Sequence, residues 1–252
     1  MNNADRLQTV ADRLRDKRRV TVLTGAGVSA ASGVPTFRGP DGLWKKQRPE
    51  TLATADAFRR DPRVVWEWYD WRRQVLSTKV PNRAHEVLAA WSERFPNFTL
   101  ITQNVDGLHE RAGTRNLIRF HGSIWEVLCW DRCANAPGRW WDDTVPFPQI
   151  PPSCPHCGGM LRPGVVWFGE PIDPDVIAKS TDALDCDVFF TVGTSAQVFP
   201  AAALAHEARH RGAFTVELNL ESTPSSNAVD LSVQGPATDL LQTLEELLLG
   251  RP

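Results

Sequence analysis

Four of the five cysteines lie in one region of the chain, in an arrangement that could bind a metal ion. They form two pairs separated by twenty residues: Cys129 and Cys133, then Cys154 and Cys157. Four thiolates suit a closed tetrahedral zinc site, which is structural because no coordination position stays open for water. The spacing leaves two alternatives, namely free thiols in a loop-rich insert or a site in which His156 replaces one sulfur. We predict zinc, and we expect Cys186, outside the pattern, to be a small buried side chain.

A glycine-rich turn follows the β-branched run at residues 20–23. Gly25 and Gly27 there permit a positive φ or a close approach of the backbone to a ligand. The small residues that come next predict a helix start, whose free N–H groups and dipole favour a phosphate. We predict a dinucleotide-binding turn, although Ala30 stands where the usual fingerprint has its third glycine. The alternative is a purely structural turn.

Further polar groups follow two other predicted strands. Gln103, Asn104 and Asp106 follow residues 98–102, and their side chains could bind ribose hydroxyls and a carboxamide. The alternative for these three is an Asx-type turn that caps a helix. His121 also follows a short strand-like segment, and a histidine with an ordinary pKa of about 6.5 can accept a proton near neutral pH. Isolated histidines are more often structural, so the residues alone leave both interpretations open.

Tyr69 and Arg72 stand three residues apart in a predicted helix, so they share one face of it. A phenol and a guanidinium can together hold a carboxylate, which arginine can bind through two hydrogen bonds. The alternative is a solvated arginine beside a stripe of aromatic core residues. The spacing by itself does not decide between them.

The elements that must position these groups alternate between strands and helices. Strands are predicted at residues 20–23, 98–102, 117–120, 165–168, 188–192 and 214–218, and helices at 1–19, 54–77, 81–94, 196–211 and 239–249. The strands repeatedly end in Gly, Ser, Thr, Asn or Asp, as in an open parallel α/β sheet that presents ligand groups at the carboxyl ends of its strands. We therefore predict a Rossmann-like α/β fold with helices on both faces, plus a small module where residues 128–162 are rich in Cys, Pro and Trp.

The composition argues against several classes of partner. The formal net charge is −2 and 23% of the residues are charged, which argues against a strongly electrostatic nucleic-acid or membrane partner. No apolar run approaches the roughly 20 residues that a membrane helix needs, and the first residues lack a secretory apolar segment. Clustered cysteines suit a metal site in a reducing compartment better than disulfides. We expect a monomeric cytoplasmic protein that binds neither nucleic acid nor membranes.

Several motifs together resemble those of the sirtuins, which are NAD-dependent protein-lysine deacylases. Residues 20–39 resemble the family signature, with the run Gly-Val-Pro-Thr-Phe-Arg-Gly at 33–39 after the glycine turn. Residues 103–106 resemble the Gln-Asn-x-Asp element, and residues 120–123 the Phe-His-Gly-Ser segment with the catalytic histidine. The cysteines resemble the zinc module, although the family usually has two residues, not three, within the first pair. The resemblance runs in the expected order from about Arg19 to the last helix.

This resemblance implies a role for individual residues. His121 would deprotonate a ribose hydroxyl of the alkylimidate that forms when the acyl oxygen attacks C1′ and nicotinamide leaves. The residues that would bind NAD are Gly25, Ala26, Gly27, Ser29, Thr36, Phe37, Arg38, Gln103, Asn104, Asp106, Gly193, Thr194, Ser195, Asn219, Glu221 and Ala237. The residues that would bind the extended substrate peptide and its acyl-lysine are Tyr69, Arg72, Val166, Trp167, Phe168, Gly169 and Glu170.

The resemblance also implies how the chain divides. One catalytic domain would span residues 1–252. Residues 1–40, 80–122 and 163–252 would form its Rossmann-like NAD domain, residues 41–79 a helical segment for substrate and cofactor, and residues 123–162 the zinc-binding module.

Tyr69 and Arg72 resemble the Tyr-x-x-Arg element of sirtuins that prefer negatively charged acyl groups. Thr36, where many deacetylase sirtuins have Asp, agrees with that class. The resemblance implies removal of succinyl, malonyl or glutaryl groups, and more weakly acetyl, with release of nicotinamide and 2′-O-acyl-ADP-ribose. The alternatives are mainly a deacetylase or an ADP-ribosyltransferase, a non-catalytic NAD or ADP-ribose binding module, and a zinc-ribbon interaction protein.

Overall fold

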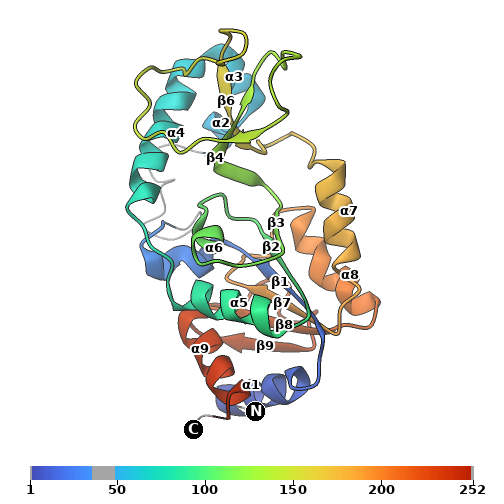
Figure 1. Cartoon of the computed structure of the whole chain (residues 1–252). Coiled ribbons are helices and arrows are strands. Elements are labelled where there is room, and N and C mark those ends of the chain that lie inside the picture. The colour runs from blue at the N-terminus through green and yellow to red at the C-terminus, as the bar shows by residue number, and fades with distance from the viewer. Residues whose placement is uncertain (1, 36–48, 251–252) are drawn as a thin grey trace.

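The computed structural model describes residues 2–35 and 49–250. Within them, six parallel strands form the main sheet in the order β3-β2-β1-β7-β8-β9 (Figure 1). The strands are β1 (Arg19–Thr24), β2 (Asn97–Thr102), β3 (Leu117–Arg119), β7 (Val188–Val192), β8 (Phe214–Asn219) and β9 (Leu231–Gln234). The chain runs outward from β1 to β3 and then returns to β7 on the other side of β1. The direction of progression therefore reverses between β1 and β7, which is where open parallel sheets bind ligands.

Helices cover both faces of this sheet, so its central strands are buried almost throughout. Successive side chains alternate between the faces, because Phe190 packs in one core cluster and Phe189 in the other. The helices on the Phe190 side are α1 (Asn3–Leu14), α5 (Arg83–Arg94) and α9 (Ala237–Leu248); those on the Phe189 side are α7 (Pro174–Asp182) and α8 (Leu204–His210). These layers match the predicted α/β fold with helices on both faces.

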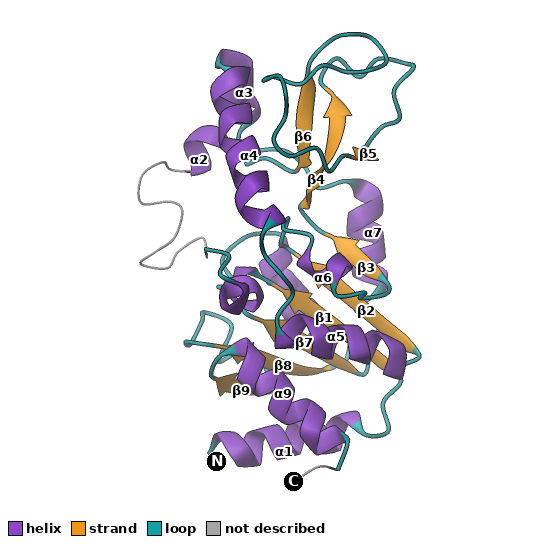
Figure 2. Cartoon of the chain, turned by 60° about the vertical axis from the view of Figure 1, so that its left-hand side comes forward, coloured by secondary structure: helices purple, strands orange, loops and turns teal. Residues whose placement is uncertain are grey.

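A smaller unit lies beyond the carboxyl edge of the main sheet, at the top of Figures 1 and 2. Its antiparallel sheet has the order β5-β4-β6, from β4 (Gly122–Cys129), β5 (Trp140–Trp141) and β6 (Leu161–Val165). Three helices accompany it: α2 (Pro49–Leu52), α3 (Ala55–Arg60) and α4 (Pro62–Ser77). Phe58, Trp66 and Trp167 are buried in its core. The division of the chain at residues 40, 79, 122 and 162 stays a prediction.

Two of the predicted helices are wrong in part. The helix predicted at 54–77 is interrupted at Asp61, whose side chain caps α4 by accepting a hydrogen bond from the Val64 N–H, with Pro62 in the first turn. The helix predicted at 196–211 begins only at a 3₁₀ turn, η3 (Ala201–Ala203), and continues as α8. Ala196 has a φ of 51°, and Pro200 disfavours a helical backbone in the residue before it.

Two further predicted elements differ from the structure, one in its bounds and one in its helix type. The strand predicted at 165–168 is β6, which ends at Val165. The predicted helix start after the glycine turn is a 3₁₀ helix, η1 (Ala26–Ser32).

Among residues 2–35 and 49–250, no helix combines the length and the apolar character needed to cross a membrane.

Candidate active site

The polar groups predicted to bind a ligand lie at the carboxyl edge of the main sheet. Gly25 follows β1, Gln103 follows β2 and Gly193 follows β7, and these three strands are neighbours. His121 lies two residues beyond β3, the strand next to β2. Residues far apart in the chain are thus brought together at the switch point, as the pattern of strand ends predicted.

The glycine turn packs directly against the turn after β7. The Gly25 N–H donates to the Val192 carbonyl at 3.0 Å, and the Gly27 N–H donates to the Gly193 carbonyl at 2.8 Å. A Cβ on Gly27 would lie 2.8 Å from the Gly193 Cα, and one on Gly25 would lie 2.7 Å from the Thr194 Cβ. Glycine is therefore required at both positions because the two turns lie so close together. Neither glycine has a positive φ, so backbone conformation is not the reason.

Asn104, Asp106 and Ser29 hold one another in a buried network beneath this turn. The Ser29 hydroxyl donates to Asp106 Oδ2 at 2.7 Å, and Asn104 Nδ2 donates to the Gly25 carbonyl at 3.1 Å. The other carboxylate oxygen of Asp106 accepts the Leu108 N–H at 2.9 Å, so the Asx-type turn named as the alternative is present. Burial raises the pKa of Asp106, while the bonds from Leu108 and Ser29 lower it. The same side chains serve the loop and face the pocket described below.

His121 is held in one tautomer by a backbone group. Its Nδ1 lies 3.2 Å from the Gln103 carbonyl oxygen, which can only accept, so Nδ1 carries the hydrogen and Nε2 keeps a free lone pair. The Gln103 side chain donates in turn to the Thr194 hydroxyl at 3.0 Å, which joins the ends of β2 and β7. Burial lowers the pKa of His121 below 6.5, although the bond to Gln103 opposes this shift. The imidazole of His121 is therefore neutral near pH 7.

Two buried histidines that sequence reasoning did not select support this region. His85 Nδ1 accepts the Asn82 N–H at 3.2 Å, and its Nε2 lies 3.4 Å from the Ser29 hydroxyl. His109 Nε2 lies 3.0 Å from the Thr24 hydroxyl, and the two imidazole rings are 4.8 Å apart. Burial lowers the pKa of His85 to about 4 and that of His109 well below its ordinary value. The position of His85 three residues after the helix cap Asn82 was the only local signal.

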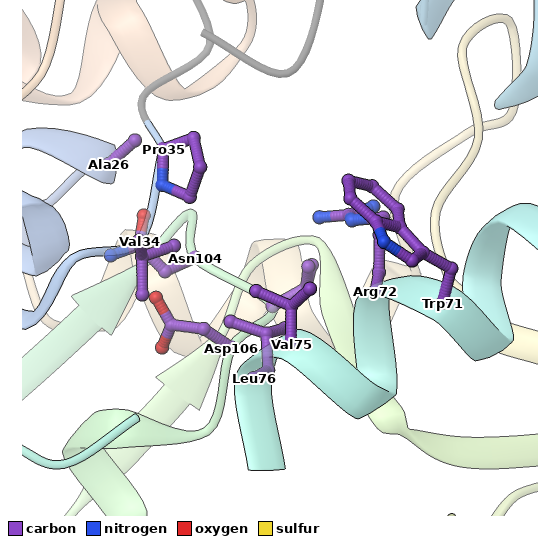
Figure 3. A pocket seen from close by; sticks show the side chains of 10 residues that line it. Ala26, Val34, Pro35, Trp71, Arg72, Val75, Leu76, Asn104 and Asp106 are labelled. Carbon is purple, nitrogen blue, oxygen red and sulfur yellow. The ribbon is translucent and has the colours of Figure 1, made fainter. Parts of the chain in front are cut away.

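A pocket opens beside Asn104 and Asp106 (Figure 3). Its lining residues are Ala26, Val34, Pro35, Trp71, Arg72, Val75, Leu76, Asn104, Val105 and Asp106. Arg72 extends from α4 toward the side formed by Val34 and Pro35. Arg72, predicted to hold an acyl carboxylate, therefore lines the same pocket as Asn104 and Asp106, which are predicted to hold the cofactor.

Arg72 is half-buried and stacked on aromatic rings. Its Cζ lies 4.8 Å from the Trp68 ring centroid and 5.6 Å from that of Tyr69. Burial lowers the pKa of Arg72, while Tyr69 and Asp106 raise it. Within the described part of the chain its guanidinium forms no ion pair with a carboxylate. Tyr69, one turn earlier, is 1% exposed, so the two side chains share a face as predicted but differ in exposure.

The stretch predicted to bind the peptide has side chains that point in different directions. Trp167 is 1% exposed, whereas Phe168 is 48% exposed and its N–H donates to the Ala53 carbonyl at 2.9 Å. The Glu170 carboxylate binds the Arg162 guanidinium through both oxygens, at 2.6 and 2.9 Å. Only part of this stretch therefore presents its side chains outward.

The residues predicted around the distal half of the cofactor lie at the ends of β8 and α9. Asn219 Nδ2 donates to the Glu221 carbonyl at 2.8 Å, so the two residues share one turn. Ala237 is the first residue of α9. Thr36, Phe37 and Arg38 lie outside the described residues.

Comparison with known proteins identifies the family of this chain. A sequence profile of the Sir2 family matches residues 25–200. The chain belongs to the Sir2 family. The NAD-dependent protein deacylase of Aquifex aeolicus (strain VF5) is 48% identical over 230 residues, covering 91% of this chain and 95% of that protein.

This Sir2-family chain is also similar to two solved structures that contain bound ligands. The crystal structure of a Sir2 homologue with NAD has a TM-score of 0.88 and 41% identity, covering 96% of this chain and 94% of that one. A Sir2 protein with a p53 peptide and NAD+ has a TM-score of 0.80 and 27% identity, covering 95% and 97% of the two chains.

The four paired cysteines of this Sir2-family chain converge in the small unit. Their sulfur atoms all lie within 4.8 Å of one another. The Cys129–Cys157 sulfur distance is 3.7 Å and the Cys133–Cys154 distance is 3.9 Å. Tetrahedral zinc with Zn–S bonds of about 2.3 Å requires sulfurs about 3.8 Å apart. The cluster fits a structural zinc ion, and the three-residue gap in the first pair does not prevent closure.

Replacing one buried ligand should remove both the zinc and its stabilisation. For Cys154→Ser we expect less than about half an equivalent of zinc and a thermal midpoint lower by roughly 5–10 °C, because zinc binding contributes to folding free energy. Metal analysis and melting with and without a chelator would measure this. Cys186→Ser is the matched control, since Cys186 is buried outside the cluster and should keep both the zinc and the chelator response. Full zinc content in Cys154→Ser would contradict the site.

Proposed function

We propose that this chain removes acidic acyl groups (succinyl, malonyl or glutaryl) from protein lysines, and acetyl more weakly. As a member of the Sir2 family it is an NAD-dependent protein deacylase, so the acyl preference is the new part. The products would be nicotinamide, the free lysine and 2′-O-acyl-ADP-ribose. The observation that carries the proposal is Arg72, which lines one pocket with Asn104 and Asp106.

A positive charge in this pocket needs an explanation. Removing a guanidinium from water is costly unless an anion pairs with it. Among the described residues Arg72 forms no direct ion pair, and Asp106, in the same pocket, acts on it only through its charge. The carboxylate at the end of a succinyl or malonyl chain would supply the anion and could be held bidentately. An acetyl group carries no charge and would leave Arg72 unpaired. The proposed preference follows from that difference.

We propose that NAD binds at the switch point, with nicotinamide and its ribose near Asn104 and Asp106 and the adenine near Asn219. The residues proposed to contact it are Gly25, Ala26, Gly27, Ser29, Thr36, Phe37, Arg38, Gln103, Asn104, Asp106, Gly193, Thr194, Ser195, Asn219, Glu221 and Ala237. His121 is the proposed general base, because its free Nε2 can accept the proton of a ribose hydroxyl.

The acylated substrate is proposed to be an extended protein segment that lies along residues 166–170. Phe168 supports this placement, because its side chain is exposed beside the backbone bridge between Thr54 and Phe168. Extended peptides commonly bind by adding a strand to such an edge. A monomeric state, a cytoplasmic location and the absence of nucleic-acid and membrane partners stay predictions.

One peptide that carries succinyl-, malonyl- or acetyl-lysine at the same position tests the proposed function. Mass spectrometry after incubation with and without NAD should show NAD-dependent loss of the acidic groups well ahead of acetyl. Loss of acetyl alone would contradict the acidic preference and leave the deacylase. No loss of any group would favour a non-catalytic NAD-binding module.

A further inference from the structure

Trp167 contacts Tyr69, one of the two residues proposed to bind the acyl group, from inside the small unit. Its indole Nε1 donates a hydrogen bond to the Tyr69 hydroxyl oxygen at 3.0 Å. Both side chains are 1% exposed, so this bond is shielded from water. Trp167 therefore contacts α4 at Tyr69 through its side chain, whereas the neighbouring Phe168 is exposed.

The direction of the Trp167 indole is fixed on several sides. The Arg162 guanidinium carbon lies 3.6 Å from its ring centroid, and the Phe58 ring lies 5.2 Å away. Both oxygens of Glu170 bind Arg162, and one of them also accepts the Trp167 backbone N–H at 2.9 Å. The indole N–H therefore has little freedom to turn away from Tyr69.

This contact determines what the Tyr69 hydroxyl can still do. A phenol has one hydrogen to donate and lone pairs that accept, and Trp167 occupies a lone pair. Within the described part of the chain, no acceptor takes the Tyr69 hydroxyl hydrogen. Burial raises the pKa of Tyr69, although Arg72 and Trp167 lower it, so the hydroxyl keeps its hydrogen at neutral pH. The phenol is left as a buried donor beside Arg72.

We propose that Trp167 is a positioning residue for acyl-group selection: its indole N–H orients the Tyr69 hydroxyl to donate to the carboxylate of an acidic acyl chain. The inference deepens the proposed function and depends on it. A hydrogen bond received by the phenol oxygen also polarises the O–H bond, which strengthens donation to an anion. Arg72 supplies the charge, while the Trp167–Tyr69 pair supplies a neutral, directed donor.

A double-mutant cycle on kcat/KM tests this, with succinyl and acetyl versions of one peptide. Trp167→Phe keeps an aromatic ring and removes the N–H, so the succinyl/acetyl ratio should fall about fivefold, mainly through KM for the succinyl peptide. Tyr69→Phe should lower the ratio at least as much. Adding Trp167→Phe to Tyr69→Phe should change the ratio no further, because Trp167 acts through the hydroxyl.

Trp66 provides a matched control in the same core. It is fully buried, and its Nε1 donates to the Leu161 carbonyl at 2.7 Å. Trp66→Phe loses an equivalent buried N–H bond and should leave the ratio unchanged. If Trp167→Phe fails to fold, 3-benzothienylalanine at position 167 keeps the fused ring without the N–H and should lower the ratio in the same way.

Each outcome separates the two proposals. A wild-type enzyme without acidic preference would overturn the proposed function and this inference together. A clear wild-type preference that survives Trp167→Phe would overturn the inference alone. A fall in the ratio that persists undiminished in the Tyr69→Phe background would also overturn it, because Trp167 would then act on the pocket by another route.

Discussion

Replacing His121 with alanine is expected to lower NAD-dependent deacylation by at least about a hundredfold, the range that loss of a general base typically costs. The Gln103 carbonyl fixes the hydrogen on Nδ1 and leaves Nε2 as the acceptor, and alanine offers no substitute for that lone pair. Binding of NAD should be largely retained, since the variant removes one side chain at the end of β3. Turnover of an acylated peptide at saturating NAD, together with calorimetric NAD titration, measures both effects.

His210→Ala is the control for this experiment, because His210 is exposed on α8. It should retain wild-type turnover. If His121→Ala turned over within a few-fold of the wild type, His121 would not be the base. NAD binding without turnover in the wild type would instead support the binding-module alternative.

The pH dependence gives a second test of His121. Its pKa lies below 6.5 because of burial, and only the neutral imidazole can accept a proton. The rate should therefore stay level as pH falls toward 6.5 and decline only as pH passes through the lowered pKa. His121→Ala should lose this acidic limb while keeping any others. A decline centred above 6.5 would mean that another group is being titrated.

The buried parallel strands were the part of the fold most accessible to sequence reasoning. β7 matches its predicted bounds, because all five of its residues are buried and a strand covered on both faces is apolar throughout. β9 has no such pattern: Leu-Ser-Val-Gln lies at the sheet edge, and only Val233 is buried. It was not predicted, because it is recognisable as a strand only through its pairing with β8 and not through its composition.

The candidate site shows the same division. The cysteine cluster could be predicted because its two pairs have a recognisable spacing, and the glycines and His121 were selected because each sits in a local motif. His85 and His109 were missed because their partners, Ser29 and Thr24, are more than fifty residues away in the chain. The contact between Trp167 and Tyr69 spans 98 residues and could not be read from spacing either. Networks of this kind exist only once the two units have folded.

Replacing Arg72 with methionine is expected to lower the succinyl/acetyl ratio of kcat/KM at least about thirtyfold. The arginine lines the pocket, has no described carboxylate partner and can form charge-assisted hydrogen bonds, which are worth about 2 kcal/mol each. Methionine has a similar length and can fill the space without a charge, so the succinyl peptide should lose far more than the acetyl peptide. Competition between the two peptides in one reaction, read by mass spectrometry, measures the ratio directly.

Arg63→Met, on the same helix, is the control for losing an arginine charge outside the pocket. Arg63 is exposed and pairs with Glu67, so its loss should leave the ratio unchanged. Arg72→Lys should give an intermediate ratio, because an ammonium keeps the charge but cannot bind a carboxylate with a planar fork. If Arg72→Met kept the wild-type ratio, the acidic group would have to be recognised elsewhere. That result would leave the deacylase activity in place. It would contradict both the proposal that Arg72 binds the acyl carboxylate and the proposed role of Trp167.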